Sequence, residues 1–168
     1  MYKNILRYSP EIDSLRAIAV FSVILFHFSP EILRGGFLGV DIFFVISGYL
    51  MVTIINNKII DNNFSFSIFY LRRIKRLIPS LLSMTVFIIV LGFVFSPPNE
   101  LVNIFEGALS SLFNFSNIYF YFESGYFDQA AQNNPFIHTW TLSLEEQFYI
   151  FLPIFLVIFR KYTFYALI

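Results

Sequence analysis

The chain has 168 residues, of which 57% are hydrophobic and only 13% are charged, with a mean hydropathy of +0.70. Soluble domains carry about 25% charged residues, so this composition places the chain among membrane proteins. Eleven basic and eleven acidic residues cancel, and no strong positive field points to nucleic acid as a partner. Cysteine is absent, which excludes disulfides, thiolate nucleophiles and cysteine-ligated metals.

Apolar segments follow one another along the chain and predict membrane-spanning helices. They cover about residues 15–28, 40–55, 78–95 and 148–159, and the last extends backward to a helix start near Asn134 and Pro135. Residues 98–136 contain several interrupting polar side chains, which would be costly against lipid. The expected fold is therefore all-α, a polytopic transmembrane bundle of about four spans plus one interfacial or re-entrant segment.

Basic residues gather at Lys3 and Arg7, between residues 58 and 76, and at Arg160 and Lys161. The positive-inside rule places all three groups in the cytoplasm, which works if residues 98–136 stay on the outer side. A crossing by residues 101–122 would instead put the third group outside. A cleaved signal peptide is disfavoured, because acidic and basic residues interrupt the first apolar run and no small-residue cleavage site follows it.

The first apolar segment carries two costly polar side chains, Arg16 and His27, with Asp13 just before them. Eleven positions at about 100° each place Arg16 and His27 within about 20° of one helix face and about 16 Å apart along the axis. The two side chains cannot touch, but they can line one polar passage. The alternative is an interfacial arginine that snorkels and a histidine that is hydrogen-bonded inside the bundle.

Asp41 opens the second span, and the hairpin through residues 29–38 returns the chain to the membrane side of His27. We therefore expect the His27 imidazole and the Asp41 carboxylate at similar depth. A carboxylate on the far ring nitrogen would fix the tautomer and raise the basicity of the imidazole, as a general base requires. The alternative is that Asp41 only caps its helix, where the helix dipole favours a negative charge.

The stretch HTWTLSLEEQFY forms a further polar cluster. His138, Thr141 and Glu145 share one face of a helix, and Glu146 points about 100° away from that face. Adjacent glutamates leading into a lipid span are hard to explain as solvated surface, and an intramembrane carboxylate indicates a functional site. A metal site is not expected, because the chain has only two histidines and they lie on different helices.

The stretch LRRIKRLIP places Arg72, Arg73, Lys75 and Arg76 within two helical turns. Such a cluster could bind phosphates, and it is equally a topology signal or an anchor to lipid headgroups.

Together these stretches resemble the membrane-bound acyltransferase-3 family, which O-acylates bacterial surface polysaccharides and related acceptors. Four motifs occur in the family's order over about residues 9–153. They are PEIDSLRAIAVFSVILFHF with its R-x10-H pattern, GGFLGVDIFFVISGYL, FYLRRIKRLIP with its R-x-x-R pattern, and HTWTLSLEEQFY. The sequence departs from the family in having Thr141 where serine is usual.

The resemblance implies transfer of an acyl group, usually acetyl, from a cytoplasmic acyl-CoA donor to a glycan hydroxyl on the outer side. It makes His27 the candidate catalytic histidine and Arg16 its partner. Our hypothesis is that Arg73 and Arg76, with Arg72 beside them, hold the donor phosphates. Asp41 would then orient His27, which deprotonates the acceptor or relays the acyl group, and Glu145 would orient or protonate a partner.

Family members have about twice as many residues in the membrane domain. We therefore expect residues 1–168 to be the N-terminal part of that domain, with no soluble domain among them, and inactive if alone. The missing helices and an SGNH-hydrolase-like domain are expected partners, as are the bilayer and a surface glycan. The expected location is the bacterial cytoplasmic membrane, with several spans. A transporter or channel with a polar passage is the alternative function, and an inactive remnant or structural partner of another chain is a third.

Overall fold

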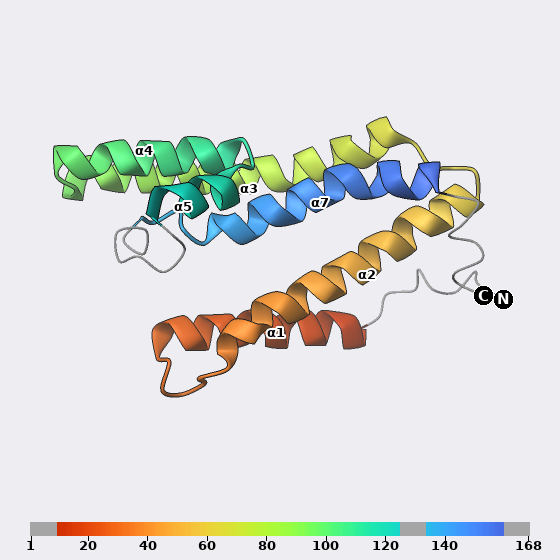
Figure 1. Ribbon diagram of the computed structural model, residues 1–168, viewed down its shortest axis with the longest axis horizontal. Coiled ribbons are helices and arrows are strands. Elements are labelled where there is room, and N and C mark those ends of the chain that lie inside the picture. Colours follow the sequence, from red (N-terminus) through yellow and green to blue (C-terminus); the bar gives the residue numbers. More distant parts are fainter. Residues whose placement is uncertain (1–9, 125–133, 160–168) are drawn as a thin grey trace. The chain divides into compact units, whose positions relative to one another are not determined.

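The fold was analysed in a computed structural model that describes residues 10–124 and 134–159. Within those ranges the chain is all-α (Figure 1). Its helices are α1 (Pro10–Phe28), the 3-10 turn η1 (Gly36–Leu38), α2 (Gly39–Ile60), α3 (Phe66–Phe95), α4 (Pro98–Leu112), α5 (Ser116–Ser124) and α7 (Thr139–Ile158). The basic residues Lys3, Arg7, Arg160 and Lys161 lie outside the described residues.

Among the described residues, three helices are long and apolar enough to cross a membrane: Gly36–Ile60, Phe66–Phe95 and Thr139–Ile158. The expectation of an all-α membrane fold is confirmed. The first expected span forms helix α1, but it is not among these three helices, because Glu11, Asp13 and Arg16 lie in its first two turns. Helix α3 begins at Phe66, well before residue 78 where the apolar segment was expected to start, and the basic cluster lies in this helix, on consecutive turns as predicted.

Contacts divide the chain into two compact units, Met1–Phe64 with Leu152–Ile168, and Ser65–Phe151. In the first unit, α1 and α2 form a hairpin closed by glycines. A Cβ atom added to Gly36 would lie 2.3 Å from the Ser22 carbonyl oxygen, and one added to Gly39 would lie 2.3 Å from the Ala19 carbonyl oxygen. Only a residue without a side chain allows these backbones to approach so closely.

In the second unit, α4 folds back along α3 after the Ser96–Pro97 corner, and α5 turns back again (Figure 1). Pro98 opens α4, at the position where a missing N–H costs nothing. A small core of Ile104, Ala108, Phe120 and Phe136 joins α4, α5 and the turn before α7. The stretch expected to be interfacial or re-entrant is therefore mostly helical, and neither of its helices is long enough to be a candidate span.

Candidate functional site

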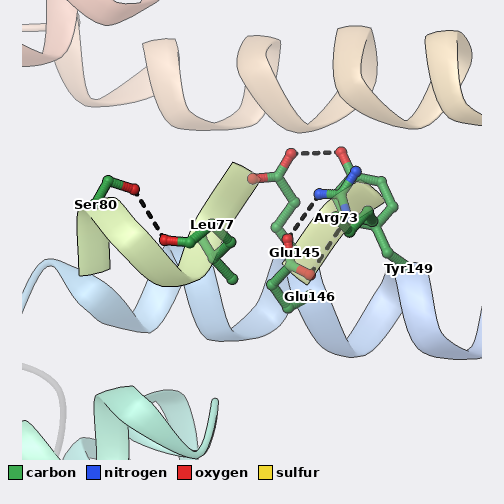
Figure 2. Close-up of polar contacts among 6 residues, drawn as sticks. All are labelled: Arg73, Leu77, Ser80, Glu145, Glu146 and Tyr149. Carbon is green, nitrogen blue, oxygen red and sulfur yellow. Dashed lines mark hydrogen bonds and ion pairs between the residues drawn. The ribbon is translucent and has the colours of Figure 1, made fainter. Parts of the chain in front are cut away.

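An ion pair joins Arg73 of α3 to Glu146 of α7 within the second unit (Figure 2). The Arg73 Nη2 atom lies 2.6 Å from Glu146 Oε1, and Nε lies 3.4 Å from Oε2, so the guanidinium meets the carboxylate with two nitrogens. The glutamate is buried, with 9% of its surface exposed. A charge at such a place is stable only when it is paired and hydrogen-bonded.

Tyr149 connects this ion pair to the second glutamate. Its ring, which is 3% exposed, lies 3.5 Å from the guanidinium carbon of Arg73, a cation–π contact. Its hydroxyl donates a hydrogen bond to Glu145 Oε1 at 2.5 Å. Figure 2 shows Arg73, Glu145, Glu146 and Tyr149 pointing toward one another from α3 and α7. The cluster therefore brings two carboxylates together with one guanidinium.

The cluster gives Arg73 partners that the donor-binding prediction did not include. A guanidinium already neutralised by Glu146 and stacked on Tyr149 has little charge left for a phosphate. The neighbouring Arg72 and Arg76 side chains are exposed on α3. Of the three arginines expected to hold the donor, Arg72 and Arg76 are the more exposed.

A cavity of about 210 Å³ adjoins the ion pair. It is lined by Arg73, Glu146, Tyr149 and Asn114, and otherwise by the Tyr70, Ile74, Leu77, Ile78 and Ile150 side chains. Asn114 adopts a left-handed backbone with φ of 56°, which asparagine tolerates better than other non-glycine residues. Its side-chain oxygen is buried without a hydrogen-bond partner among the described residues.

Helix α7 also carries a stripe of hydrogen-bonding side chains at Thr139, Ser143 and Gln147. Thr139 Oγ1 lies 2.6 Å from Ser111 Oγ of α4, and Ser143 Oγ lies 2.7 Å from Ser116 Oγ of α5. Gln147 Nε2 donates to the Asn114 carbonyl at 2.8 Å. Spacing of four residues puts all three on one helix face. The four-residue spacing is visible in the sequence, but the polar face predicted for this stretch does not include these three residues.

His138, Thr141 and Glu145 were expected on one face of a helix, but His138 lies outside α7 in the structure. Helix α7 begins at Thr139, so His138 lies in the preceding turn, where its carbonyl accepts a hydrogen bond from Thr141 Oγ1 at 3.0 Å. Asn134 does cap this turn, because its side-chain oxygen accepts from the Phe136 N–H at 2.9 Å. The buried carboxylate is Glu146, whereas Glu145 is half-buried.

In the first unit, His27 lies in the last turn of α1 and is exposed. Its Nδ1 atom lies 2.8 Å from the Val23 carbonyl oxygen. Because a carbonyl only accepts, Nδ1 carries the proton in this contact and the lone pair of the neutral ring resides on Nε2. A backbone carbonyl thus fixes the tautomer that we expected Asp41 to fix.

The register of the hairpin places Asp41 at another depth than His27. Gly39 packs against Ala19, and Phe43 lies under Arg16, with 5.3 Å between the guanidinium carbon and the ring centroid. Asp41 is therefore level with the Arg16–Ala19 turn, eight or more residues from His27, which is about 12 Å or more along the axis. A hairpin over residues 29–38 predicts equal depth for the Asp41 and His27 side chains. In the structure Gly36 already packs on Ser22 of α1, so Asp41 lies further along the helix than predicted.

Arg16 is half-buried, and its Nε atom has no hydrogen-bond partner among the described residues. Asp13 lies one turn earlier, exposed in the first turn of α1. The structure thus groups Arg16, His27 and Asp41 in one unit, and the arginines of α3 with His138, Glu145 and Glu146 in the other. The catalytic and donor-binding roles of these residues stay predictions.

Comparison with known proteins gives consistent relatives. A family model described as an acyltransferase domain matches residues 9–168. The chain is 41% identical over 159 residues to the peptidoglycan O-acetyltransferase OatA of Listeria monocytogenes. The aligned stretch covers 94% of this chain and 25% of that protein. It is 44% identical over 158 residues to the putative peptidoglycan O-acetyltransferase YrhL of Bacillus subtilis, covering 90% and 24% respectively.

A putative O-acetyltransferase of Staphylococcus aureus is 38% identical over 160 residues, which is 93% of this chain and 26% of that protein. No solved structure matches the chain. The chain spans about a quarter of the length of the curated relatives it matches. None of these names supports the transporter or channel alternative.

Proposed function

This chain belongs to the acyltransferase-3 family, and from that premise we propose that it carries part of a membrane enzyme that O-acetylates peptidoglycan. The matches to proteins named as peptidoglycan O-acetyltransferases are the observation that supports this proposal most directly. The enzyme would lie in the bacterial cytoplasmic membrane with several spans. The three long apolar helices support that location.

The acetyl donor in this proposal is an acyl-CoA at the cytoplasmic face. Its phosphates would contact Arg72 and Arg76, which are exposed on α3 within four residues of each other. Arginine forks bind phosphate oxygens through two parallel hydrogen bonds, which suits this pair to the task. Arg73 would instead hold α7 in place through Glu146.

His27 is the proposed general base. Its Nε2 atom would take the proton of the acceptor hydroxyl while the hydroxyl oxygen attacks the thioester carbonyl of the donor. The carbon–sulfur bond then breaks, the leaving thiolate takes up the proton, and the products are an acetyl ester and free CoA. The contact of Nδ1 with Val23 supports this role, because it holds the proton on the other ring nitrogen.

The test is complementation in a Gram-positive host that lacks its own peptidoglycan O-acetyltransferases. The complete natural protein, its His27→Ala variant and the control Glu31→Ala, an exposed residue of the α1–α2 connection, would be expressed at matched membrane levels. Loss of a general base lowers the rate by about 10²- to 10⁴-fold. Ester-linked acetate on purified peptidoglycan is expected with the wild type and Glu31→Ala, and close to background with His27→Ala. Peptidoglycan without ester-linked acetate in the wild-type strain would refute the proposed function.

A further inference from the structure

A cavity of about 550 Å³ lies at the C-terminal end of α3, away from the arginine cluster. This volume is within the range of about 300–1,000 Å³ that is typical of small-molecule sites. Its walls come from α3, α4, α5 and the turn before α7. The lining residues that matter most are Phe95, Glu100, Asn103, Tyr119, Phe120 and Glu123.

The polar groups of this cavity divide into those that build it and those that are open to a ligand. Tyr119 donates its hydroxyl to Glu106 Oε2 at 2.9 Å. Burial, and then this hydrogen bond, raise the pKa of the Tyr119 hydroxyl above its usual 10.0, so it stays neutral and its ring serves as a wall. Asn134 is used internally, bonding the Asn103 carbonyl and the Phe136 N–H. The side chains of Glu100, Asn103 and Glu123 are exposed and line the cavity, so a ligand can reach them.

These open groups select the chemistry of the ligand. A carboxylate only accepts hydrogen bonds, so Glu100 and Glu123 suit a ligand rich in hydroxyl or N–H donors. The aromatic walls of Phe95, Tyr119 and Phe120 suit the apolar face of a ring. The described lining contains two glutamates and neither lysine nor arginine, so its field repels phosphates and hence the acyl-CoA donor.

The position of the cavity along α3 also favours a ligand on the outer side of the membrane. Arg76 and Ser96 are twenty residues apart on one helix, which corresponds to about 30 Å, the thickness of the hydrocarbon core. If the basic residues of α3 are cytoplasmic, the cavity opens at the outer face. That is the face on which a cell-wall glycan lies.

We propose that this cavity binds the acceptor glycan, as a neutral, amide-bearing sugar whose hydroxyls donate to Glu100 and Glu123 and whose ring packs on Phe95, Tyr119 and Phe120. The inference rests on the proposed function for the identity of the glycan. It places the acceptor at the glutamates and only the phosphates of the donor at the arginines. The thioester is at the other end of the donor's long arm, so the proposed reaction requires this arm to extend along α3 toward the acceptor.

The experiment uses the complete natural protein in proteoliposomes with acetyl-CoA and a tetrasaccharide of N-acetylglucosamine as the probe. Two variants would be compared with the wild type: the double variant Glu100→Gln/Glu123→Gln, and Asn103→Trp, which fills the cavity from an exposed position. The matched control is Glu31→Gln/Asp61→Asn, which removes two exposed carboxylates elsewhere. Thermal unfolding would verify that each variant is folded, and saturation-transfer NMR would measure probe binding independently of turnover.

The double variant is expected to raise the KM for the tetrasaccharide about tenfold, because bonds to carboxylates become weaker bonds to neutral amides. The KM for acetyl-CoA and kcat should stay at the wild-type values, and Asn103→Trp should abolish probe binding. Probe binding that is absent in the wild type, or unchanged in both folded variants, would overturn the inference, as would a rise in the KM for acetyl-CoA instead. Binding that the wild type shows and Asn103→Trp lacks, without any acetyl transfer, would uphold the cavity and refute the proposed function.

Discussion

Each of the two units of this chain is stabilised internally, and the contacts that do so differ between the two. The α1–α2 hairpin is closed by glycines whose backbones touch α1, and its polar residues His27 and Asp41 are exposed. The second unit, Ser65–Phe151, here called the α3–α7 unit, is joined by polar side chains that bond one another. They include the Arg73–Glu146 ion pair and the hydroxyl pairs Ser111–Thr139 and Ser116–Ser143. The hairpin is thus closed mainly by backbone contacts, whereas the α3–α7 unit is joined mainly by side-chain hydrogen bonds.

This difference guides the choice between functional and structural polar residues. In lipid, helices gain little from burying apolar surface against each other, so close backbone contact and interhelical hydrogen bonds hold them together. A buried polar residue whose partners are all within the protein is then explained by packing. By this criterion packing accounts for the burial of Glu146 and Ser143, and the catalytic role of His27 stays a prediction.

The largest effect is expected from a side chain at Gly39. Its backbone is helical, with φ of −56°, so any residue could adopt it, and only the contact with Ala19 and Val23 forbids a side chain. Gly39→Leu should therefore separate α1 from α2 and leave almost no folded protein, measured by size-exclusion chromatography of the detergent-solubilised complete protein. Gly35→Leu is the control, because a Cβ there meets only Leu38, at 3.9 Å. Equal yields from both variants would show that glycine packing does not close the hairpin.

The next effect concerns the ion pair of the α3–α7 unit. Glu146→Ala leaves the Arg73 guanidinium without its carboxylate, which should cost about 3–5 kcal/mol of stability, measured by thermal or denaturant unfolding. The double variant Arg73→Met/Glu146→Leu should be close to the wild type, since apolar replacement of a buried pair is often neutral. Arg72→Ala, an exposed neighbour, should change stability by less than about 0.5 kcal/mol. A Glu146→Ala protein with unchanged stability and no activity would show that the Arg73–Glu146 pair serves the reaction and not the stability of the fold.

The sequence predicts most helices but not their full extent. Apolar runs mark α1, α2, the second half of α3 and the second half of α7, because burial in lipid demands a continuous apolar stretch. The predicted span leaves out the first turns of α3, because they hold the basic residues of the stretch LRRIKR, which was predicted to be helical but not to continue the span. Arginine, lysine and leucine are nevertheless good helix formers, and their charges can extend beyond the hydrocarbon.

The site was predictable as a set of residue types and not as a set of contacts. Arg73 and Glu146 are 73 positions apart, and no local pattern fixes such a pair. The depth of Asp41 depends on how Gly36 and Gly39 pack on α1, which is a tertiary contact that spacing does not encode. The stripe Thr139–Ser143–Gln147, by contrast, was visible as a four-residue repeat, and so was Tyr149 at four residues from Glu145.

The smallest effect on stability is expected from the hydroxyl pairs of the α3–α7 unit, and it measures how much one such hydrogen bond contributes to the free energy of unfolding. Ser143→Ala removes the bond between two buried hydroxyls, Ser143 and Ser116, which lie 2.7 Å apart. Interhelical hydrogen bonds in membrane proteins contribute on average about 0.6 kcal/mol and at most about 1.7, so unfolding should become easier by about 1 kcal/mol. The control is Ser83→Ala, whose exposed hydroxyl donates to the Ser80 carbonyl of its own helix at 2.9 Å.

Because the hydrogen bond of the Ser83 hydroxyl stays within α3, its loss should leave the free energy of unfolding almost unchanged. Equal effects of Ser143→Ala and Ser83→Ala would mean that the hydroxyl pair adds nothing between α5 and α7. The unit would then rest on the Arg73–Glu146 pair and the small core around Phe136. In that case the buried serines would mark close helix approach, as the glycines do in the hairpin, and the two units would differ only in which small residue permits it.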